Sequence, residues 1–270
     1  MSGTLTFGGH AASEFGMRIG GVNVYSASGN NAQMFSVPGL IGEVFPDEAD
    51  VVVPNEIREY SAAIYLRNAS AAAVEARMNQ IRSWLLDYAG YVQLTDSYEP
   101  SFYRKACFVG SFAPIRKGAG SNFQVPLSFS CNPKRFIANA PDFVMGTSET
   151  VTEVTPYAVS GYSINKNAKP LIKISNTGGN NPAFLIRFRP FNSIDPSEEY
   201  GSISVAANIP STETIYFDAE TLNATDGNGR NRNQYILDVT GDIFLPPSRS
   251  IVQKTATGAK VTITPRWWVR

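Results

Sequence analysis

Apolar side chains recur at intervals of three and four residues in one stretch of the chain, between residues 70 and 90. This spacing places them in a single stripe along an α-helix and predicts that one helix face is buried. Ser70 is suited to the N-cap of this helix, and Gly90 to a left-handed turn after it. The stripe consists of Val74, Met78, Ile81, Leu85 and Tyr88.

Alternation of apolar and polar residues predicts strands on both sides of this helix. Residues 4–7, 15–25 and 58–66 precede it, and residues 91–94 follow it. Residues 102–114 and 121–131 are separated by a Lys-Gly-Ala-Gly turn at 117–120 and predict a long hairpin that closes at Asn132 to Arg135. The N-terminal half is therefore expected to be an α+β domain, a sandwich- or barrel-like sheet with one helix.

The second half of the chain has no helical periodicity after Phe136. Residues 138–155 are rich in Ser, Thr and Glu and predict a linker. We expect one domain at residues 1–137 and a second at 156–270, so that the protein is mainly β. Short strands that follow without helices predict a C-terminal β-sandwich or jelly roll. These strands are expected at residues 169–175, 183–191, 200–206, 214–218, 235–239 and 260–269.

Charge and hydropathy exclude several classes of function. The 270 residues contain 23 basic and 23 acidic side chains, and neither half has a basic excess. Sequence-specific or bulk nucleic-acid binding is therefore not expected, because phosphate binding needs clustered positive charge. No apolar run approaches the roughly 18 residues of a membrane span, and no signal peptide begins the chain. We expect no membrane association.

The chain offers little material for catalysis or for a metal or cofactor site. Its single histidine, His10, lies in a glycine-flanked segment and is expected to be a surface or packing residue. Asp226 begins a stretch that resembles a calcium loop, but Asn228-Gly229 predicts a hairpin turn more strongly. Glu198 and Glu199 are adjacent, so on a strand they would point to opposite faces and could not act as a glycosidase pair.

The cysteines and the C-terminal tryptophans are also expected to be structural. Cys107 and Cys131 fall on adjacent predicted strands but out of register, which favours two small buried residues over a disulfide. Of Trp267 and Trp268, one is expected to point into the core and the other outward. The outward indole leaves sugar stacking open as the less favoured alternative.

A Pro- and Gly-rich excursion interrupts the N-terminal half at Val37-Pro38-Gly39-Leu40-Ile41-Gly42. Proline removes a hydrogen-bond donor, so this segment cannot be a central strand. It is either a plain surface hairpin or an arm that reaches a neighbouring subunit, and the periodicity alone favours the hairpin.

Four N-terminal motifs in this order resemble the distal tail proteins of bacteriophages with long, non-contractile tails. They are Phe15-Gly16-Met17, the Pro38-Gly39-x-x-Gly42 turn, the Ile81-Arg82-Ser83-Trp84-Leu85 helix followed by Leu94-Thr95-Asp96 and Tyr103, and the strand from Leu127 to Pro133. In the second half, Ile215 to Glu220 and Val261 to Trp267 are similar to the galectin-like C-terminal domain of that family.

The resemblance implies a structural protein without enzymatic activity, cofactor or metal. It implies a six-membered ring around a channel at the tail tip of the virion, assembled in the host cytoplasm. The partners would be other copies, the tail tube protein and tail-tip or receptor-binding proteins. On this view the excursion becomes a candidate intersubunit arm that includes Pro38, Gly39, Gly42, Phe45 and Val52. The main alternative is a carbohydrate- or receptor-binding module acting through the C-terminal sandwich, and a hydrolase is a weaker one.

Overall fold

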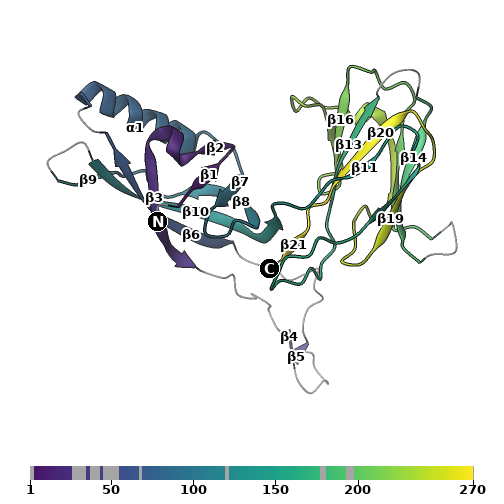
Figure 1. The fold of residues 1–270 in the computed structure, drawn as a ribbon, viewed down its shortest axis with the longest axis horizontal. Coiled ribbons are helices and arrows are strands. Elements are labelled where there is room, and N and C mark those ends of the chain that lie inside the picture. Colours follow the sequence, from purple (N-terminus) through teal and green to yellow (C-terminus); the bar gives the residue numbers. More distant parts are fainter. Residues whose placement is uncertain are drawn as a thin grey trace. The chain divides into compact units, whose positions relative to one another are not determined.

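The structure is a computed structural model that describes residues 3–25, 35–36, 43–44, 55–66, 69–118, 122–176, 181–192 and 198–269. Strands dominate these residues, and the helix predicted between residues 70 and 90 is the single α-helix among them. The predicted mainly β fold is therefore confirmed. The chain divides into two compact units, which are residues 1–138 and 139–269 (Figure 1).

Unit 1 is built on one antiparallel sheet with the strand order β2-β1-β7-β8-β10-β6-β3. The short β9 (Ile115–Arg116) pairs with the beginning of β10, and η1 (Ala12–Phe15) connects β2 to β3. Two further short strands, β4 (Phe35–Ser36) and β5 (Glu43–Val44), pair with each other. The main strands are β1 (Leu5–Phe7), β2 (His10–Ala11), β3 (Met17–Tyr25), β6 (Glu56–Tyr65), β7 (Val92–Asp96), β8 (Phe102–Val109) and β10 (Asn122–Ile137).

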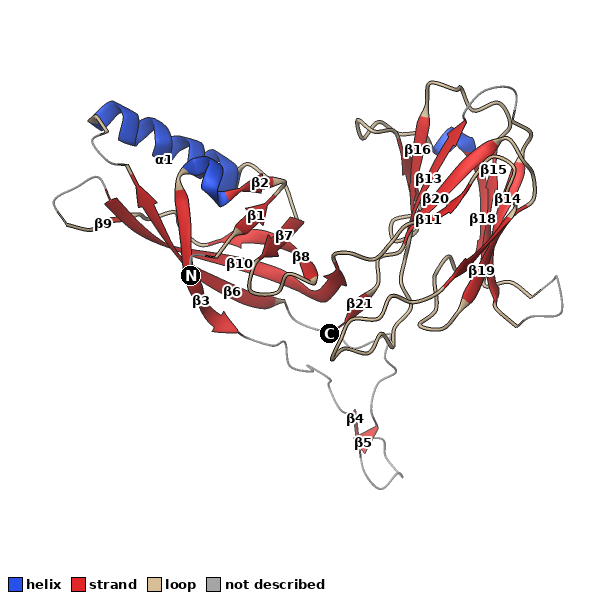
Figure 2. Cartoon of the chain, viewed as in Figure 1, coloured by secondary structure: helices blue, strands red, loops and turns tan. Residues whose placement is uncertain are grey.

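Helix α1 (Ala71–Leu86) covers one face of this sheet (Figure 2). The Ser70 hydroxyl accepts the backbone N–H of Ala73, as the N-cap prediction requires. The buried helix residues contact apolar side chains of the strands, so packing rather than helix propensity holds α1 in place. Gly90 has a φ of 121°, but the helix already ends at Leu86, before that turn. The buried helix residues are Met78, Ile81, Trp84 and Leu85.

Strand β10 is longer than the sequence predicts. It pairs with β8 as the hairpin prediction requires, with Cys107 opposite Ser130. It does not close at Asn132, however, but continues to Ile137 through a register shift between Cys131 and Arg135. An irregularity at this place accommodates Pro133, because a proline within a sheet is tolerated at a bulge.

Unit 2 consists of two five-stranded antiparallel sheets that face each other (Figure 1). Along their strands, buried residues alternate with more exposed ones, so each sheet contributes one face to a shared core. The first sheet contains β11 (Phe143–Met145), β20 (Ala259–Thr264), β13 (Leu171–Asn176), β16 (Thr214–Asp218) and β17 (Asn223–Thr225). The second contains β12 (Val151–Val154), β19 (Ser250–Lys254), β14 (Phe184–Pro190), β15 (Gly201–Val205) and β18 (Ile236–Gly241), and η2 (Asn233–Tyr235) precedes β18.

Residues 138–155 are not simply the linker that their composition predicts. Strands β11 and β12 lie in this segment and pair with β20 and β19. Met145 and Val154 are fully buried there. Tertiary pairing therefore overrides the Ser- and Thr-rich composition, which by itself carries no information about a distant partner strand.

Two cationic side chains stabilise unit 2, the buried Lys254 and the partly buried Arg266. The ammonium group of Lys254 donates to the carbonyl oxygens of Gly146 (2.7 Å) and Ala259 (2.5 Å), and burial lowers the pKa of Lys254. The Arg266 guanidinium donates to the Lys169 carbonyl at 2.6 Å and to both carboxylate oxygens of Asp218. Both side chains thus connect segments that are far apart in sequence.

Candidate functional site

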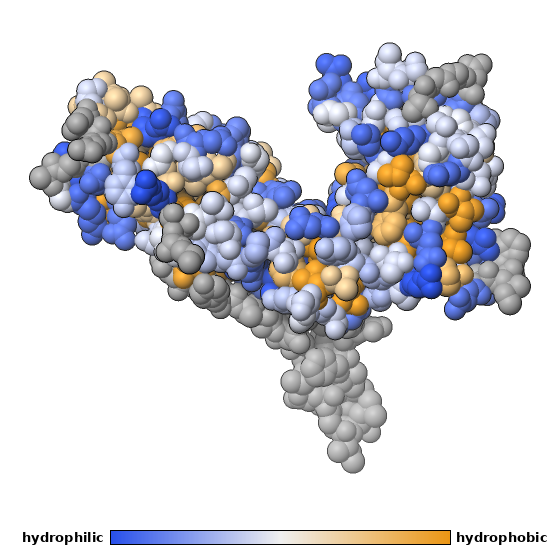
Figure 3. Space-filling view, in the orientation of Figure 1, coloured by the Kyte–Doolittle hydropathy of each residue, from blue (hydrophilic) through white to orange (hydrophobic). Residues whose placement is uncertain are grey.

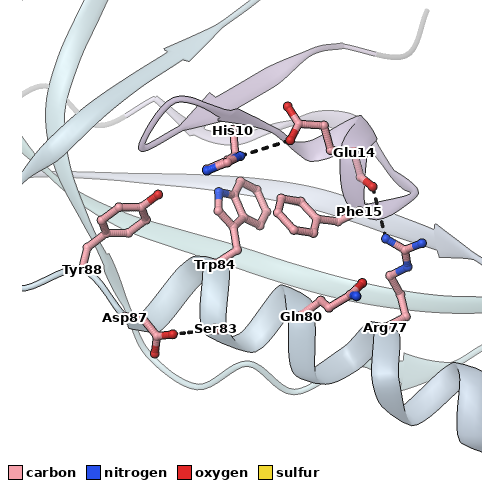
Figure 4. Close-up of a pocket in the computed structure, with 9 residues that line it drawn as sticks. All are labelled: His10, Glu14, Phe15, Arg77, Gln80, Ser83, Trp84, Asp87 and Tyr88. Carbon is pink, nitrogen blue, oxygen red and sulfur yellow. Dashed lines mark hydrogen bonds and ion pairs between the residues drawn. The ribbon is translucent and has the colours of Figure 1, made fainter.

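An open groove of about 680 Å³ lies between helix α1 and the segment that runs from β2 through η1. We call it the α1 groove. Three aromatic rings and one imidazole lie along it, and charged or amide side chains surround them (Figure 4). Its lining residues are His10, Glu14, Phe15, Arg77, Gln80, Ser83, Trp84, Asp87 and Tyr88.

Hydrogen bonds from the helix to the N-terminal strands build the floor of the groove. The Trp84 indole N–H donates to the Phe7 carbonyl at 2.9 Å, and the Tyr88 hydroxyl donates to the Gly8 carbonyl at 3.0 Å. The Phe15 ring stacks on the Trp84 indole with a centroid separation of 4.6 Å. These contacts hold the aromatic floor in a fixed geometry. The floor therefore loses little conformational entropy when a partner binds.

A carboxylate lies at each end of the groove. At one end, Arg77 donates to the Glu14 carbonyl at 3.1 Å, and the Glu14 carboxylate contacts the His10 imidazole at 3.1 Å. The backbone N–H of Ala11, followed by His10, lowers the pKa of Glu14. Asp87 lies at the other end of the groove, beyond Trp84 (Figure 4). The two carboxylates therefore give the groove an acidic rim on either side of its aromatic floor.

The groove brings together a serine, a histidine and acids, but not in the arrangement of a catalytic triad. Ser83 donates directly to Asp87 within the same helix, while His10 contacts Glu14. A triad requires the imidazole to bridge the hydroxyl and the carboxylate. This geometry supports binding by the α1 groove and does not supply an activated nucleophile.

A second cluster of charges lies in unit 1 and is almost fully buried. The Arg58 guanidinium contacts Asp96 Oδ2 at 3.0 Å through both Nε and Nη2, and the Tyr60 hydroxyl donates to the same oxygen. Glu99 forms ion pairs with Arg58, Arg104 and Arg135. We call this set the buried ion cluster; it consists of Glu56, Arg58, Tyr60, Asp96, Glu99, Arg104 and Arg135.

The buried ion cluster connects four strands and contains as many acidic as basic side chains. Burial raises the pKa of Tyr60, and the neighbouring Asp96 raises it further, so the phenol stays protonated and can act as a donor. Asp96 also accepts the backbone N–H groups of Tyr98 (2.8 Å) and Glu99 (3.0 Å). Because these ionic contacts join residues of four strands, the cluster is a structural element that fixes β6, β7, β8 and β10 relative to one another.

The Asp226 stretch forms a turn, as Asn228-Gly229 predicts. The Asp226 carboxylate accepts the backbone N–H groups of Asn228 (2.8 Å) and Arg230 (3.0 Å) and contacts Arg232 at 3.0 Å. The backbone N–H of Arg230 lowers the pKa of Asp226. The carboxylate is thus engaged within its own loop. Within the described residues, no three His, Cys, Asp or Glu side chains are grouped as metal ligands.

The remaining candidate residues are buried or contact other parts of the protein. Trp267 is fully buried and Trp268 partly exposed, as predicted, and the Trp268 indole N–H donates to the Asn167 carbonyl at 3.1 Å. Glu199 contacts Arg187 at 3.6 Å and accepts the Ser202 hydroxyl at 3.1 Å. Cys107 and Cys131 are free thiols, as expected, but only Cys131 is buried, because Cys107 is partly exposed.

The candidate intersubunit arm lies outside the described residues. Pro38, Gly39, Gly42, Phe45 and Val52 all belong to this part of the chain. The pairing of β4 with β5 places residues 35–36 beside residues 43–44.

The surface of each unit is mainly polar in the view shown, with small apolar patches (Figure 3). In unit 1, Ile115 is 57% exposed, and in unit 2, Leu222 and Leu237 are 56% and 61% exposed. Within the described ranges, no helix combines the length and the apolar character that a membrane crossing requires.

The fold of the whole chain is similar to that of two solved phage proteins. The chain is similar to the crystal structure of the SPP1 Dit (gp 19.1) protein, described as a paradigm of the hub adsorption apparatus of phages that infect Gram-positive bacteria. That match has a TM-score of 0.60 at 15% identity and covers 97% of this chain and 98% of that one. A chain of the phage P2 baseplate in its activated conformation with Ca matches with a TM-score of 0.52 at 10% identity, covering 97% of each chain. No family model matches, and no curated protein is significantly similar in sequence.

Proposed function

We propose that this chain is a structural component of a phage virion, a distal tail hub that joins the tail tube of a long, non-contractile tail to the host-adsorption apparatus. The observation that carries the proposal is the likeness in fold to the SPP1 hub protein, which extends over both units and almost the whole length of both chains. The α1 groove and the buried ion cluster support a binding and scaffolding role, because neither has the geometry of a catalytic site.

The proposed assembly is a closed ring of identical subunits, six in number by resemblance to distal tail proteins. Unit 1 would form the ring around a channel, and unit 2 would be a galectin-like platform for tail-tip or receptor-binding proteins. Residues 38–59 would act as the arm between subunits. The ring would assemble in the host cytoplasm without cofactor or metal, and a repeated contact between two different surfaces can close in this way.

Native mass spectrometry of the full chain, combined with negative-stain images, tests this proposal. The expected result is a hexamer mass and ring-shaped particles with a central opening. A glycan array on the full chain tests the alternative, a carbohydrate-binding module. Saturable glycan binding by a chain that stays monomeric up to high concentration would contradict the hub proposal and favour that alternative.

A further inference from the structure

Residues 115–118, the described end of the β9–β10 hairpin, have the properties of a docking element, and we call them the β9–β10 tip. Ile115 is 57% exposed, and the two residues that follow, Arg116 and Lys117, are exposed bases. An apolar side chain of this size costs free energy in water, and its burial against another surface would recover that cost. The tip therefore presents one apolar anchor next to positive charge.

The α1 groove has the complementary properties. Its floor is aromatic, and its rim carries the carboxylates of Glu14 and Asp87. From Arg77 to Leu86 the helix extends for about 14 Å along the groove, at about 1.5 Å per residue. A two-stranded hairpin is about 10 Å wide with its side chains, since neighbouring strands lie about 4.8 Å apart. One hairpin tip therefore fits the groove in size, in hydrophobicity and in charge.

The hairpin cannot occupy the groove of its own chain. Strand β9 pairs with Phe123 and Gln124, near the end of the sheet where β6 ends and helix α1 begins. The groove lies at the other half of the helix, beside the edge strand β2. Strands β2 and β10 are four positions apart in the sheet order, about 19 Å at normal strand spacing.

We propose that the β9–β10 tip of one copy docks into the α1 groove of the next copy, with Ile115 on the aromatic floor and Lys117 close to the Asp87 carboxylate. This inference rests on the proposed function, and it specifies the contact between subunits. The contact joins two different surfaces of unit 1, so it is heterologous and repeats from head to tail until the ring closes.

Disulfide trapping tests the contact in the full chain. Ile115→Cys is combined with Gln80→Cys, in a Cys107→Ser background that removes the partly exposed native thiol. Mild oxidation is expected to give a ladder of cross-linked oligomers on non-reducing gels. The matched control combines Gln80→Cys with Leu237→Cys, because Leu237 is as exposed as Ile115 but lies in unit 2. A yield no higher than that of the control pair would overturn the proposal.

Charge reversal tests the specificity of the contact. In the cross-linking background, Lys117→Glu and Asp87→Lys are each expected to lower the cross-linked fraction severalfold, and the two together are expected to restore it. A structural defect would not be rescued in this way. Failure of the rescue, or saccharide binding by the groove without any cross-link, would refute the second copy as its occupant.

The two proposals fail in different ways. If hexamers are seen by native mass spectrometry but the Ile115→Cys and Gln80→Cys pair does not cross-link, the docking contact is wrong and the hub proposal stands. If the pair cross-links into open chains and no ring is ever observed, the contact stands and the ring-forming hub is contradicted.

Discussion

Gly8 meets two requirements that no other residue type meets at its position. Its φ is 60°, a conformation that favours glycine, and a Cβ atom there would lie 2.2 Å from the ring of Tyr88. The Tyr88 hydroxyl donates to the Gly8 carbonyl, so the ring cannot move away without losing that hydrogen bond. The tight turn and the floor of the α1 groove therefore depend on the same missing side chain.

Replacing Gly8 with alanine should destabilise the protein by at least about 2 kcal/mol, because left-handed strain and a steric collision add. Gly9→Ala is the matched control, since Gly9 also has a positive φ (86°) but open space around its Cβ position. Gly9→Ala should lower the free energy of unfolding only by the left-handed backbone strain, about 1 kcal/mol. Urea unfolding measures the free energy of unfolding of both variants. Equal decreases would show that the Tyr88 ring moves aside without an energetic cost.

The two thiols should differ in reactivity. Burial raises the pKa of Cys131 to about 12, so almost no thiolate exists there at pH 8.5, whereas Cys107 is partly exposed. Iodoacetamide should modify Cys107 in the native protein and Cys131 only after unfolding, as read by peptide mass spectrometry. Since the folded pKa lies above the unfolded value, the contribution of Cys131 to stability should be lost as the pH rises from about 9 toward 12. Rapid native modification of Cys131 would contradict its burial.

Elements that depend on local sequence could be predicted well. Helix α1 and its cap at Ser70 follow from apolar spacing and from one side-chain hydrogen bond, both of which lie within a few residues. Strand β16 (Thr214–Asp218) has the predicted bounds for the same reason. By contrast, β11 and β12 fall in the expected linker, because their pairing partners lie about 100 residues further along the chain.

The buried ion cluster was not predictable from the sequence. Arg58 and Asp96 are 38 residues apart, and only the order of β6, β10, β8 and β7 in the sheet brings their segments near each other. The sequence does contain one indication of this cluster. Arg58 and Arg104 each occupy an inward position of an alternating strand, where an apolar residue is expected and a charge requires a partner.

Asp96→Asn should lower the free energy of unfolding by about 3 kcal/mol, because it removes the carboxylate that contacts the buried Arg58 guanidinium at 3.0 Å, while Glu99, at 3.4 Å, is shared with Arg104 and Arg135. Glu75→Gln is the control, since it makes the same carboxylate-to-amide change on the exposed face of helix α1. The control should change stability by less than about 0.5 kcal/mol. Chemical denaturation provides the measurement, and a loss below 1 kcal/mol in Asp96→Asn would show that the cluster is not a stabilising element.

At the scale of the whole molecule, each of the ion pairs described above has both partners in one unit. Asp96→Asn should therefore increase hydrogen exchange in β6, β8 and β10 and leave β13, β16 and β20 unchanged. Arg266→Met removes the contacts with Asp218 and Lys169. It should increase hydrogen exchange in β13, β16 and β20 and leave β6, β8 and β10 unchanged. Exchange monitored by mass spectrometry tests this, and increased exchange in both units after one substitution would show that they unfold together.

The candidate site could be predicted only in part. His10 was expected to be a packing or surface residue, and it lies exposed on the rim of the α1 groove. The groove itself combines residues 10–15 with residues 77–88, and no spacing in the sequence indicates that these segments meet. From the sequence alone, the aromatic residues that form its floor cannot be distinguished from ordinary core residues.

Strand β10 has a mechanical consequence. It is bonded to β6 at ten paired positions and to β8 at seven, and it ends at Ile137, next to the last residue of unit 1. Tension applied to Ile137 along the axis of this strand would load its hydrogen bonds in shear. Hydrogen bonds loaded in this way rupture together rather than one at a time, so β10 can resist such tension within unit 1.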